Sequence, residues 1–329
     1  MPASESVIHS RAAANGVAVL IVNFKAHEHL RRCLRSLLPL LSAADEVVVV
    51  DQESTDTSLN GMAREFPAVR VLASADNIGF AAGVNLAARH TQAPFLLLLN
   101  PDTTLEGGVV DALRHSLEQS PEAGVVGPRV VNDDGSVQAS ARRFPDMTTP
   151  LGGRTSWLTS MFPGNWFAAR NLKGLDAVEP MRVDWISGAC LMTRRELFER
   201  LGGLDEAFFL YWEDADYCRR VLDAGLHTIY VPTAIVHHSV GASSAHNPEL
   251  AIRAFHASAL RMFRKHAGRA GQLATPAVQA VLLVRQQMRL RNAARLAAAV
   301  HAHAPTPLEP RTAAVSIRGE VTSAERALG

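Results

Sequence analysis

The chain has 329 residues, of which 47% are hydrophobic and 20% are charged, and its formal net charge is +1. This length suits one large domain or two ordinary ones, and the composition is that of a globular protein with a buried core. The small net charge gives no overall attraction to nucleic acid, and three cysteines without a CxxC pair argue against a disulfide framework or a zinc knuckle.

The sequence shows no targeting or membrane-spanning segment. The first 16 residues contain no apolar stretch of the kind found in signal peptides. The best candidate for a spanning helix, residues 277–284, runs into Arg285 and is too short to cross a bilayer. We therefore expect a cytoplasmic protein, with any membrane contact peripheral and on the inner face of the cytoplasmic membrane.

Apolar runs alternate with amphipathic segments along the first 131 residues. Continuous apolar strands separated by amphipathic helices are typical of a parallel sheet covered by helices on both faces. The predicted strands are 16–24, 46–51, 69–74, 95–100 and 123–131, and the predicted helices are 27–41, 55–65, 79–90 and 105–119.

Polar residues follow the predicted strands, at the sheet edge where α/β proteins bind ligands. They are Asn23, Asp51, Asp76-Asn77 and Asn100-Pro101-Asp102. No GxGxxG or GxxxxGK[ST] follows the first strand, which excludes the dinucleotide-binding and P-loop patterns. Carboxylates would repel a nucleotide diphosphate unless a hard cation such as Mg²⁺ or Mn²⁺ lay between them. The sequence therefore predicts a metal-assisted nucleotide site.

A second acidic group occurs in "YWEDADYCRR" at the start of a predicted helix. The helix dipole favours carboxylates there, so capping and an ion pair from Asp216 to Arg219 or Arg220 are one interpretation. Three carboxylates beside Tyr211 and Trp212 exceed what capping needs, which favours a catalytic role.

Six segments resemble, in this order, the inverting family 2 glycosyltransferases of GT-A fold, and within them the rhamnosyltransferase-like branch of polysaccharide and O-antigen assembly. The resemblance covers about residues 16–265. The segments are "VAVLIVNFKAHEHLRRCLRSL", "VVVVDQESTD", "DNIGFAAGVNLA", "LLLLNPDTTL", "GACLMTRRELFERLGGLDEAFFLYWEDADYCRR" and "YVPTAIVHHSVGASS".

The resemblance implies an α/β, GT-A fold with a Rossmann-like, mostly parallel central sheet flanked by helices, and composition adds a C-terminal helical extension. The expected boundaries are a flexible N-terminus at 1–15, a catalytic domain at 16–248, a helical extension at 249–305 and a disordered tail at 306–329. Within the catalytic domain we expect a nucleotide half at about 16–131 and an acceptor half at about 132–248.

The resemblance also implies donor contacts along the strand ends. Asp51 matches the family residue that accepts from the base N3–H, although Gln52-Glu53 replace the usual Asp-Gly after it. Ser187 and Gly188 are small enough to border the sugar pocket. The expected donor-binding residues are Asn23, Asp51, Asn77, Gly79, Asn85, Asn100, Asp102, Ser187 and Gly188.

The implied chemistry rests on Asp214, matched to the base that takes the acceptor hydroxyl proton, and on Glu213, which holds the acceptor or orients the base. Trp212 joins Glu213 as an expected acceptor contact. Asp102 and His238 match the ligands of the cation, Mg²⁺ or Mn²⁺, and His237 is left as a buried or supporting residue. Asn100 replaces the first Asp of the family's DxD motif, so Asp102 is the only carboxylate of the motif.

The resulting hypothesis is an inverting transferase that moves a sugar, L-rhamnose from dTDP-L-rhamnose, to a hydroxyl of a glycan or lipid-linked glycan. The same fold with a UDP- or GDP-hexose donor and a non-catalytic nucleotide-sugar-binding scaffold remain alternatives. A nucleotidyltransferase would need a triphosphate loop, which is missing. No nucleic-acid partner is expected.

Two further segments leave alternatives open. The aromatic-rich residues 150–170 are either an acceptor or lipid-contacting flap or a small satellite cluster on the core. The basic amphipathic segment 250–266 either lies on a membrane surface or packs on the catalytic domain.

Overall fold

The computed structural model describes residues 15–53, 56–144, 176–239 and 247–302. The segment 150–170 and the tail 306–329 lie outside these residues, and so does the N-terminus up to residue 14. Those three expectations therefore stay predictions.

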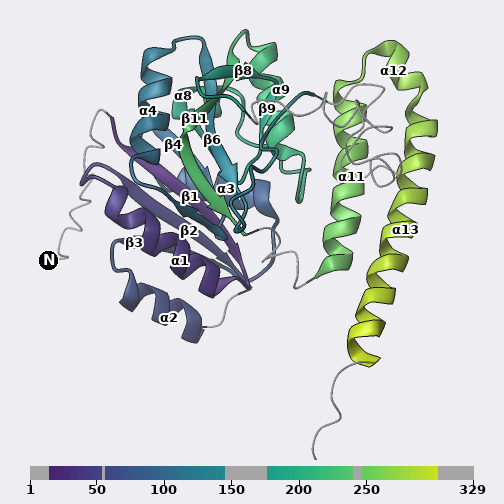
Figure 1. The fold of residues 1–329 in the computed structure, drawn as a ribbon, viewed down its shortest axis with the longest axis horizontal. Helices are drawn as coiled ribbons and strands as arrows, with labels where there is room; N and C mark the ends of the chain where they lie inside the picture. Colours follow the sequence, from purple (N-terminus) through teal and green to yellow (C-terminus); the bar gives the residue numbers. More distant parts are fainter. Residues whose placement is uncertain (1–14, 54–55, 145–175, 240–246, 303–329) are drawn as a thin grey trace, which may run out of the picture.

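A nine-stranded sheet forms the centre of the molecule (Figure 1). Strands β1 to β4 pair in parallel, as the apolar runs predict, and β11 runs parallel to β6. The strand order is β3-β2-β1-β4-β10-β6-β11-β5, with β8 paired to β11. The strands are β1 (Val17–Phe24), β2 (Glu46–Gln52), β3 (Val69–Ser74), β4 (Phe95–Leu99), β5 (Thr103–Leu105), β6 (Ala123–Val131), β8 (Met181–Val183), β10 (Cys190–Arg194) and β11 (His227–His238).

Two features of the sheet differ from the sequence expectation. The antiparallel strand β10 lies between β4 and β6, so these two strands do not pair with each other. The segment 103–105, expected near the start of a helix, is strand β5 and pairs with β11. Both pairings join residues far apart in sequence, which local periodicity does not report. A separate two-stranded sheet joins β7 (Ala141–Arg142) to β9 (Trp185–Ile186).

Helices cover both faces of the sheet (Figure 1). Helices α1, α2 and α4 contribute to one buried apolar cluster, and α3, α8 and α9 contribute to the other. The helices are α1 (His27–Leu37), followed by the 3₁₀ turn η1 (Leu38–Leu40), α2 (Asp56–Glu65), α3 (Phe80–Arg89), α4 (Val109–Gln119), α8 (Arg195–Arg200), α9 (Glu213–Asp223), α11 (Pro248–His266), α12 (Arg269–Leu273) and α13 (Thr275–Ala302).

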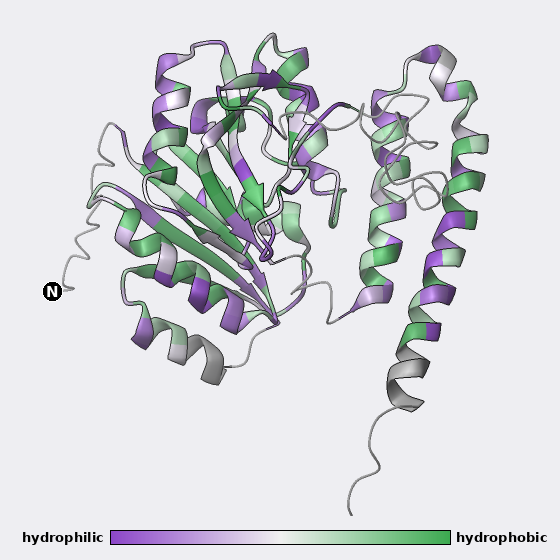
Figure 2. Cartoon of the chain, viewed as in Figure 1, coloured by the Kyte–Doolittle hydropathy of each residue, from purple (hydrophilic) through white to green (hydrophobic). Residues whose placement is uncertain are grey.

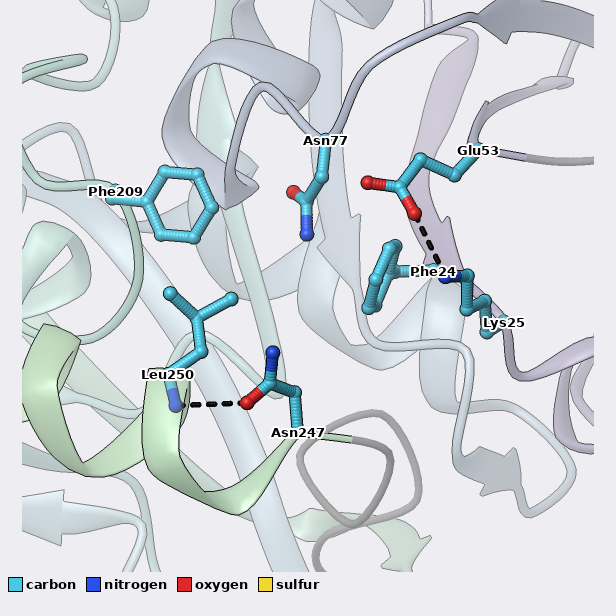
Figure 3. A pocket seen from close by; sticks show the side chains of 7 residues that line it. All are labelled: Phe24, Lys25, Glu53, Asn77, Phe209, Asn247 and Leu250. Atoms are coloured by element: carbon cyan, nitrogen blue, oxygen red, sulfur yellow. Dashed lines mark hydrogen bonds and ion pairs between the residues drawn. The ribbon is translucent and has the colours of Figure 1, made fainter.

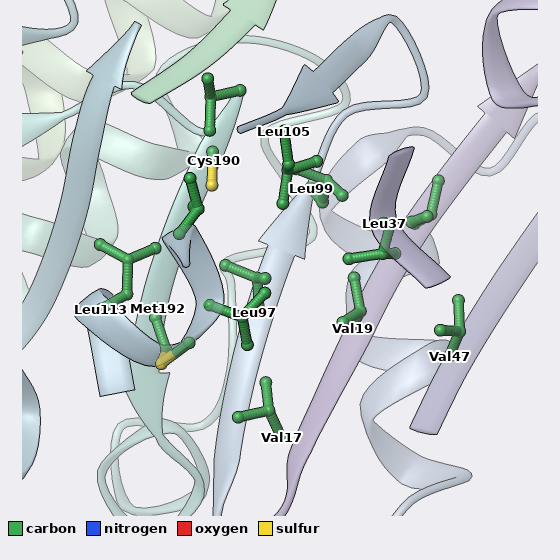
Figure 4. Close-up of a cluster of buried hydrophobic side chains, with 14 of the residues drawn as sticks. Val17, Val19, Leu37, Val47, Leu97, Leu99, Leu105, Leu113, Cys190 and Met192 are labelled. Carbon is green, nitrogen blue, oxygen red and sulfur yellow. The ribbon is translucent and has the colours of Figure 1, made fainter. Parts of the chain in front are cut away.

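The central strands are apolar on both faces because each face is covered by helices. In β1, Val17, Val19 and Ile21 belong to one buried cluster, whereas Ala18 and Leu20 belong to the other. Figure 4 shows the first cluster around β1 and β4. In Figure 2 the apolar colour is concentrated on the strands, while the covering helices alternate between the two colours.

The C-terminal helices form an antiparallel pair beside the α/β unit, with α13 farther from the sheet (Figure 1). Helix α11 packs on the catalytic domain: Met262 is buried in the second cluster, and the Ser258 hydroxyl donates to the Leu210 carbonyl at 3.0 Å. Its cations pair with carboxylates of the domain, as Lys265 does with Asp205 at 2.8 Å. For residues 250–266, the structure therefore shows packing on the domain. Within the described residues, no helix is long and apolar enough to cross a membrane.

Candidate active site

The first group of polar side chains lies at the ends of β1 and β2. Asn23 and Asp51 face each other in register on these strands, and the Asn23 amide donates to Asp51 Oδ1 at 2.7 Å. Both residues are at most 1% exposed. Asn23 Oδ1 and Asp51 Oδ2 have no hydrogen-bond partner within the described residues. Two buried, unpartnered acceptors side by side favour a ligand that brings hydrogen-bond donors.

His27 belongs to the same corner, although the sequence analysis did not select it. Its Nδ1 lies 3.9 Å from Asp51 Oδ2 and is buried without a hydrogen-bond partner in the described part of the chain. The available signal was its position, three residues beyond the end of the first strand. Helix α1 begins at His27, so its first turn faces the strand ends.

The next loop, between β3 and α3, is tied to the end of β2 by Gln52. The Gln52 side chain accepts from the Ile78 amide at 2.7 Å and donates to the Gly79 carbonyl at 3.3 Å. This buried residue therefore has a structural role where the family usually has Asp. Gly79 adopts φ +86°, and a Cβ there would lie 2.5 Å from the Phe209 carbonyl oxygen. Only glycine fits this position, and Asn77 Oδ1 accepts from its amide at 3.1 Å.

The predicted metal ligands come together at the end of β11. His238 pairs in register with Thr103, and His238 Nε2 lies 3.2 Å from Asp102 Oδ1. The two atoms do not meet the geometry of a hydrogen bond, and Asp102 Oδ1 is buried without a hydrogen-bond partner. Gln138 supports the pair by accepting from His238 Nδ1 at 3.1 Å and donating to the His238 carbonyl at 2.7 Å.

This arrangement fits a divalent cation. Because the Gln138 amide donates through its nitrogen to the His238 carbonyl, its oxygen faces Nδ1, which must then bear the proton. In the neutral imidazole, the Nε2 lone pair then faces the Asp102 carboxylate, and a cation between them would bind both. Within the described residues, no group of three or more His, Cys, Asp or Glu side chains could hold a metal, so further ligands would come from the substrate or water.

His237 has a different role. Its Nε2 lies 2.9 Å from Glu106 Oε1, and the side chain is 39% exposed. It is therefore not a buried residue, and its ion pair is on the surface beside β5.

Asp214 is held by two backbone amides at the start of α9. Its Oδ2 accepts from the Gly188 amide at 2.7 Å, and its Oδ1 accepts from the Ala215 amide at 2.7 Å. A Cβ at Gly188 would lie 3.4 Å from the Asp214 Cβ, which is ordinary van der Waals contact. Gly188 lies two residues before the start of β10, whose first residue pairs with Leu99 at the end of β4. Asp214 is therefore fixed at the same sheet edge.

The carboxylates of α9 have distinct environments. Burial raises the pKa of Asp214, and the amides of Gly188 and Ala215 with the charge of Arg142 partly offset this effect. Burial raises the pKa of Glu213 well above its usual range, and the charges of Asp214 and Asp216 add to the effect. Glu213 Oε2 and the Trp212 indole nitrogen are both buried without a hydrogen-bond partner among the described residues.

Asp216 serves the fold. Its fully buried carboxylate contacts Arg220 at 2.8 Å within α9, and Lys265 at 2.7 Å and His266 at 2.8 Å on α11. The ion pair with Arg220 was one of the two that the sequence predicted.

The residues just before the helix are strained: Tyr211 has φ 68° and Trp212 has φ 71°, a region that bulky side chains rarely adopt. Such strain is concentrated at functional sites.

Three expected donor residues remain. All polar atoms of the Asn85 side chain are engaged with the 203–206 loop: its amide donates to the Leu204 carbonyl and to Glu206, and its oxygen accepts from the Leu204 amide. These contacts give Asn85 a structural role, because they hold the 203–206 loop against α3. Asn100 accepts the Thr103 hydroxyl through its main-chain oxygen, and Ser187 lies partly buried beside Gly188.

These groups follow one another along the sheet edge. Asp51 is on β2, Asn23 on β1, the Asn100–Asp102 turn follows β4, and Asp214 meets the start of β10. Adjacent strands are about 4.8 Å apart, so Asp51 and the end of β4 are separated by about 10 Å. This one edge therefore offers a polar corner, a cation site that includes His238 of β11, and a carboxylate base.

Comparisons with known proteins show the family to which the chain belongs. A family model described as "Glycosyltransferase like family 2" matches residues 14–268. An N-acetylglucosaminyl-diphospho-decaprenol L-rhamnosyltransferase of Mycobacterium tuberculosis is 33% identical over 252 residues, 73% of this chain and 81% of the relative. A low-salt glycan biosynthesis hexosyltransferase of Haloferax volcanii is 27% identical over 208 residues, 62% of this chain and 61% of the relative.

Solved structures show the same fold. A structure of GalNAc-T7 with UDP, GalNAc and Mn²⁺ gives a TM-score of 0.53 at 18% identity and covers 69% of this chain but 44% of that chain. A mannosyltransferase from Pyrobaculum calidifontis in complex with GDP-Man and Mn²⁺ gives a TM-score of 0.50 at 18% identity, covering 89% of this chain and 76% of that chain. The chain is an enzyme of GT-A fold and belongs to the family 2 glycosyltransferases, in their rhamnosyltransferase-like branch.

Proposed function

We propose that this glycosyltransferase moves L-rhamnose from dTDP-L-rhamnose, with inversion at the anomeric carbon, to a hydroxyl of a lipid-linked glycan in cell-surface polysaccharide biosynthesis. The single observation that supports it best is that the Asn23–Asp51 corner, the Asp102–His238 pair and Asp214 all lie at the same edge of the sheet. These three groups suit the base, the diphosphate and the transferred sugar of a nucleotide-sugar donor. The rhamnose donor follows the Mycobacterium tuberculosis relative, and UDP- or GDP-hexose donors are the alternative.

In the proposed mechanism, Asp214 is the general base. A sugar hydroxyl is too weakly acidic to lose its proton beforehand, so the proton passes to Asp214 as the acceptor oxygen bonds to the anomeric carbon. The bond from that carbon to the diphosphate oxygen breaks at the same time, on the opposite face. The two backbone amides hold both carboxylate oxygens in place, and burial makes the carboxylate a stronger base.

The other residues of the edge position the reactants. Asp102 and His238 would hold Mg²⁺ or Mn²⁺, which stabilises negative charge on the departing diphosphate. Glu213 Oε2 and the Trp212 indole N–H are buried acceptor and donor atoms without partners in the described structure. An acceptor hydroxyl both donates and accepts, so it would satisfy the two atoms together, and we assign the acceptor contact to them.

Peripheral contact with the inner face of the cytoplasmic membrane belongs to the same proposal, but through α13 rather than α11. Helix α13 contains no Asp or Glu, and it exposes Val281, Val284 and Met288. Residues 250–308 also contain no acidic residue. An apolar and basic surface of this kind suits an anionic lipid surface, where a lipid-linked acceptor would be found.

The test is a thermal-shift panel of nucleotide sugars with Mn²⁺ or Mg²⁺, followed by transfer assays with the donor that binds. A donor at 100 times its Kd would stabilise the protein by about 2.7 kcal/mol. We expect the cation dependence to be lost in Asp102→Ala and His238→Ala, with His237→Ala as the matched control. Full transfer by Asp102→Ala and Asp214→Asn together would refute the mechanism, and donor binding without any turnover would favour the scaffold alternative.

A further inference from the structure

A cavity of about 280 Å³ opens at the nucleotide end of the sheet edge (Figure 3). One side is formed by residues that follow three parallel strands: Phe24 and Lys25 after Asn23 on β1, Glu53 at the end of β2, and Asn77 after β3. The residues that follow β1 and β2 on this side therefore lie one or two positions beyond Asn23 and Asp51 in the sequence. The volume of the cavity is just below the range of about 300–1,000 Å³ for small-molecule pockets, so it suits one part of a nucleotide sugar.

The opposite side of the cavity comes from a different part of the chain. Phe209 precedes the catalytic helix α9, and Asn247 and Leu250 belong to the first turn of α11. In Figure 3 the Phe209 ring and the Leu250 side chain lie together across the cavity from Phe24 and the Lys25–Glu53 pair. Asn247 caps α11 by accepting from the Leu250 amide at 3.0 Å, which fixes this wall.

The strand-end side of the cavity is strained. Lys25 has φ 53° and Glu53 has φ 54°, although neither is glycine. Their side chains form an ion pair at 2.8 Å, and Lys25 Nζ also lies 5.0 Å from the centre of the Phe24 ring. Two non-glycine residues in the left-handed region at the ends of neighbouring strands cost free energy, and such strain is concentrated at ligand sites.

The chemistry of the cavity suits a nucleobase. Two phenylalanine rings offer faces for stacking, and the Asn77 and Asn247 amides offer polar contacts at the rim. The unpartnered atoms of Asn23, Asp51 and His27 do not line the cavity, but they lie at or just beyond the ends of β1 and β2, where they would meet the polar edge of a base. A diphosphate would instead seek Asp102 and His238, which do not line this cavity.

We propose that helix α11 is a wall of the nucleobase site, so that Leu250, in the C-terminal helical part of the chain, helps to decide which nucleotide the enzyme accepts. This inference rests on the proposed function, because it assumes a nucleotide donor. It extends that function by placing a residue that determines nucleotide specificity on α11, in addition to the residues at the strand ends.

Helix α11 is held firmly enough to act as such a wall. Ser258 donates to the Leu210 carbonyl, and the Phe255 ring packs on Tyr211 and Trp212 with ring centroids 5.8 Å apart in both pairs. The Phe209 carbonyl in turn accepts from the Phe80 amide at 2.8 Å. The donor loop, the segment before α9 and α11 are thus one connected unit.

The experiment compares Leu250→Trp, which fills the cavity, with Ala257→Trp, which places the same side chain on the exposed part of α11. Isothermal titration measures the binding of dTDP, UDP and GDP, and of inorganic pyrophosphate, each with Mn²⁺. Pyrophosphate has no base, so it reports on the cation site alone. Leu250→Ser, which widens the cavity, is the second variant in case the tryptophan disturbs folding.

We expect Leu250→Trp to raise the Kd of the preferred nucleoside diphosphate at least about tenfold. Leu250→Ser should make the Kd values for the three nucleotides more similar to one another. In both Leu250 variants the Kd for pyrophosphate should stay at the wild-type value, and Ala257→Trp should bind all of these ligands as wild type does. Nucleotide affinities within twofold of wild type in both Leu250 variants would overturn the inference, as would an equal loss of pyrophosphate binding. Wild-type nucleotide binding without sugar transfer would refute the proposed function and leave this inference standing. A wild-type protein that binds none of the nucleotides would overturn both.

Discussion

Asp214 and Asp216 offer a direct separation of catalysis from stability, because they lie two residues apart in the first turns of α9. Asp214 accepts from two backbone amides at the sheet edge, whereas Asp216 is fully buried and contacts the cations Arg220 and Lys265 and the His266 ring. The same change, aspartate to asparagine, should therefore produce opposite results at the two positions.

Asp214→Asn should lower kcat while leaving the protein nearly as stable as wild type. Removing a general base lowers kcat by about 10²–10⁴-fold. The asparagine amide leaves one of the Gly188 and Ala215 N–H groups without an acceptor, which costs about 1–3 kcal/mol. It also removes a carboxylate whose pKa is raised by burial, which offsets part of that loss. We expect the free energy of unfolding to change by no more than about 1 kcal/mol.

Asp216→Asn should instead lower the free energy of unfolding. Breaking a buried ion pair costs about 3–5 kcal/mol, because the partner charge stays buried. Both cations keep other partners, since Lys265 also pairs with Asp205 and Arg220 also donates to the Leu201 carbonyl. The lower end, about 3 kcal/mol, is therefore expected, and this corresponds to a fall in Tm of about 5–10 °C.

The assay measures kcat at saturating donor and acceptor well below the unfolding temperature of either variant, together with urea unfolding curves. Equal losses of turnover in the two folded variants would contradict the assignment of Asp214 as base. Retention of turnover within tenfold of wild type by Asp214→Asn would contradict it as well.

Two further changes test the environment of the site. The pKa of Glu213 is raised by burial and by the charges of Asp214 and Asp216. The contribution of this residue to stability is therefore fully present below its unfolded pKa of about 4.3 and is lost as the pH rises through its folded pKa. In urea titrations, Glu213→Gln should match the wild-type free energy of unfolding near pH 4 and exceed it near pH 8. A variant that is no more stable than wild type at pH 8 would refute this. Gly79→Ala places a Cβ 2.5 Å from the Phe209 oxygen at φ +86°. It should lower the free energy of unfolding by about 1–3 kcal/mol and raise the KM for the donor. Gly107 has open space around it, so Gly107→Ala should leave both quantities nearly unchanged. Equal effects at the two glycines would count against a strained donor loop.

The sequence predicts the nucleotide half well because its signals are local. Continuous apolar runs mark β3 and β6 at the residues observed, and the polar residues after each strand reach one edge because parallel strands share their direction. The register of β1 and β2 then brings Asn23 and Asp51 together.

The second half is predicted less well because its contacts are long-range. The insertion of β10 between β4 and β6 depends on pairings across more than 60 residues, which no local pattern reports. Gln138, which orients His238, lies 100 residues away from it in a segment without periodicity. Asn85 shows the opposite error: its residue type suits a donor contact, but it lies more than a turn into α3 and faces the 203–206 loop.

The boundary between catalytic domain and C-terminal extension is expected after residue 248, and we propose that it lies after α11 instead. Lys265 and His266 hold the buried Asp216 of α9, and Phe255 packs on the strained Tyr211 and Trp212. These contacts fix the segment that leads into the base. The family model also continues to residue 268, two residues beyond the end of α11. The extension would then begin with α12 and α13, whose basic residues form no ion pair with an acidic residue in the described part of the chain.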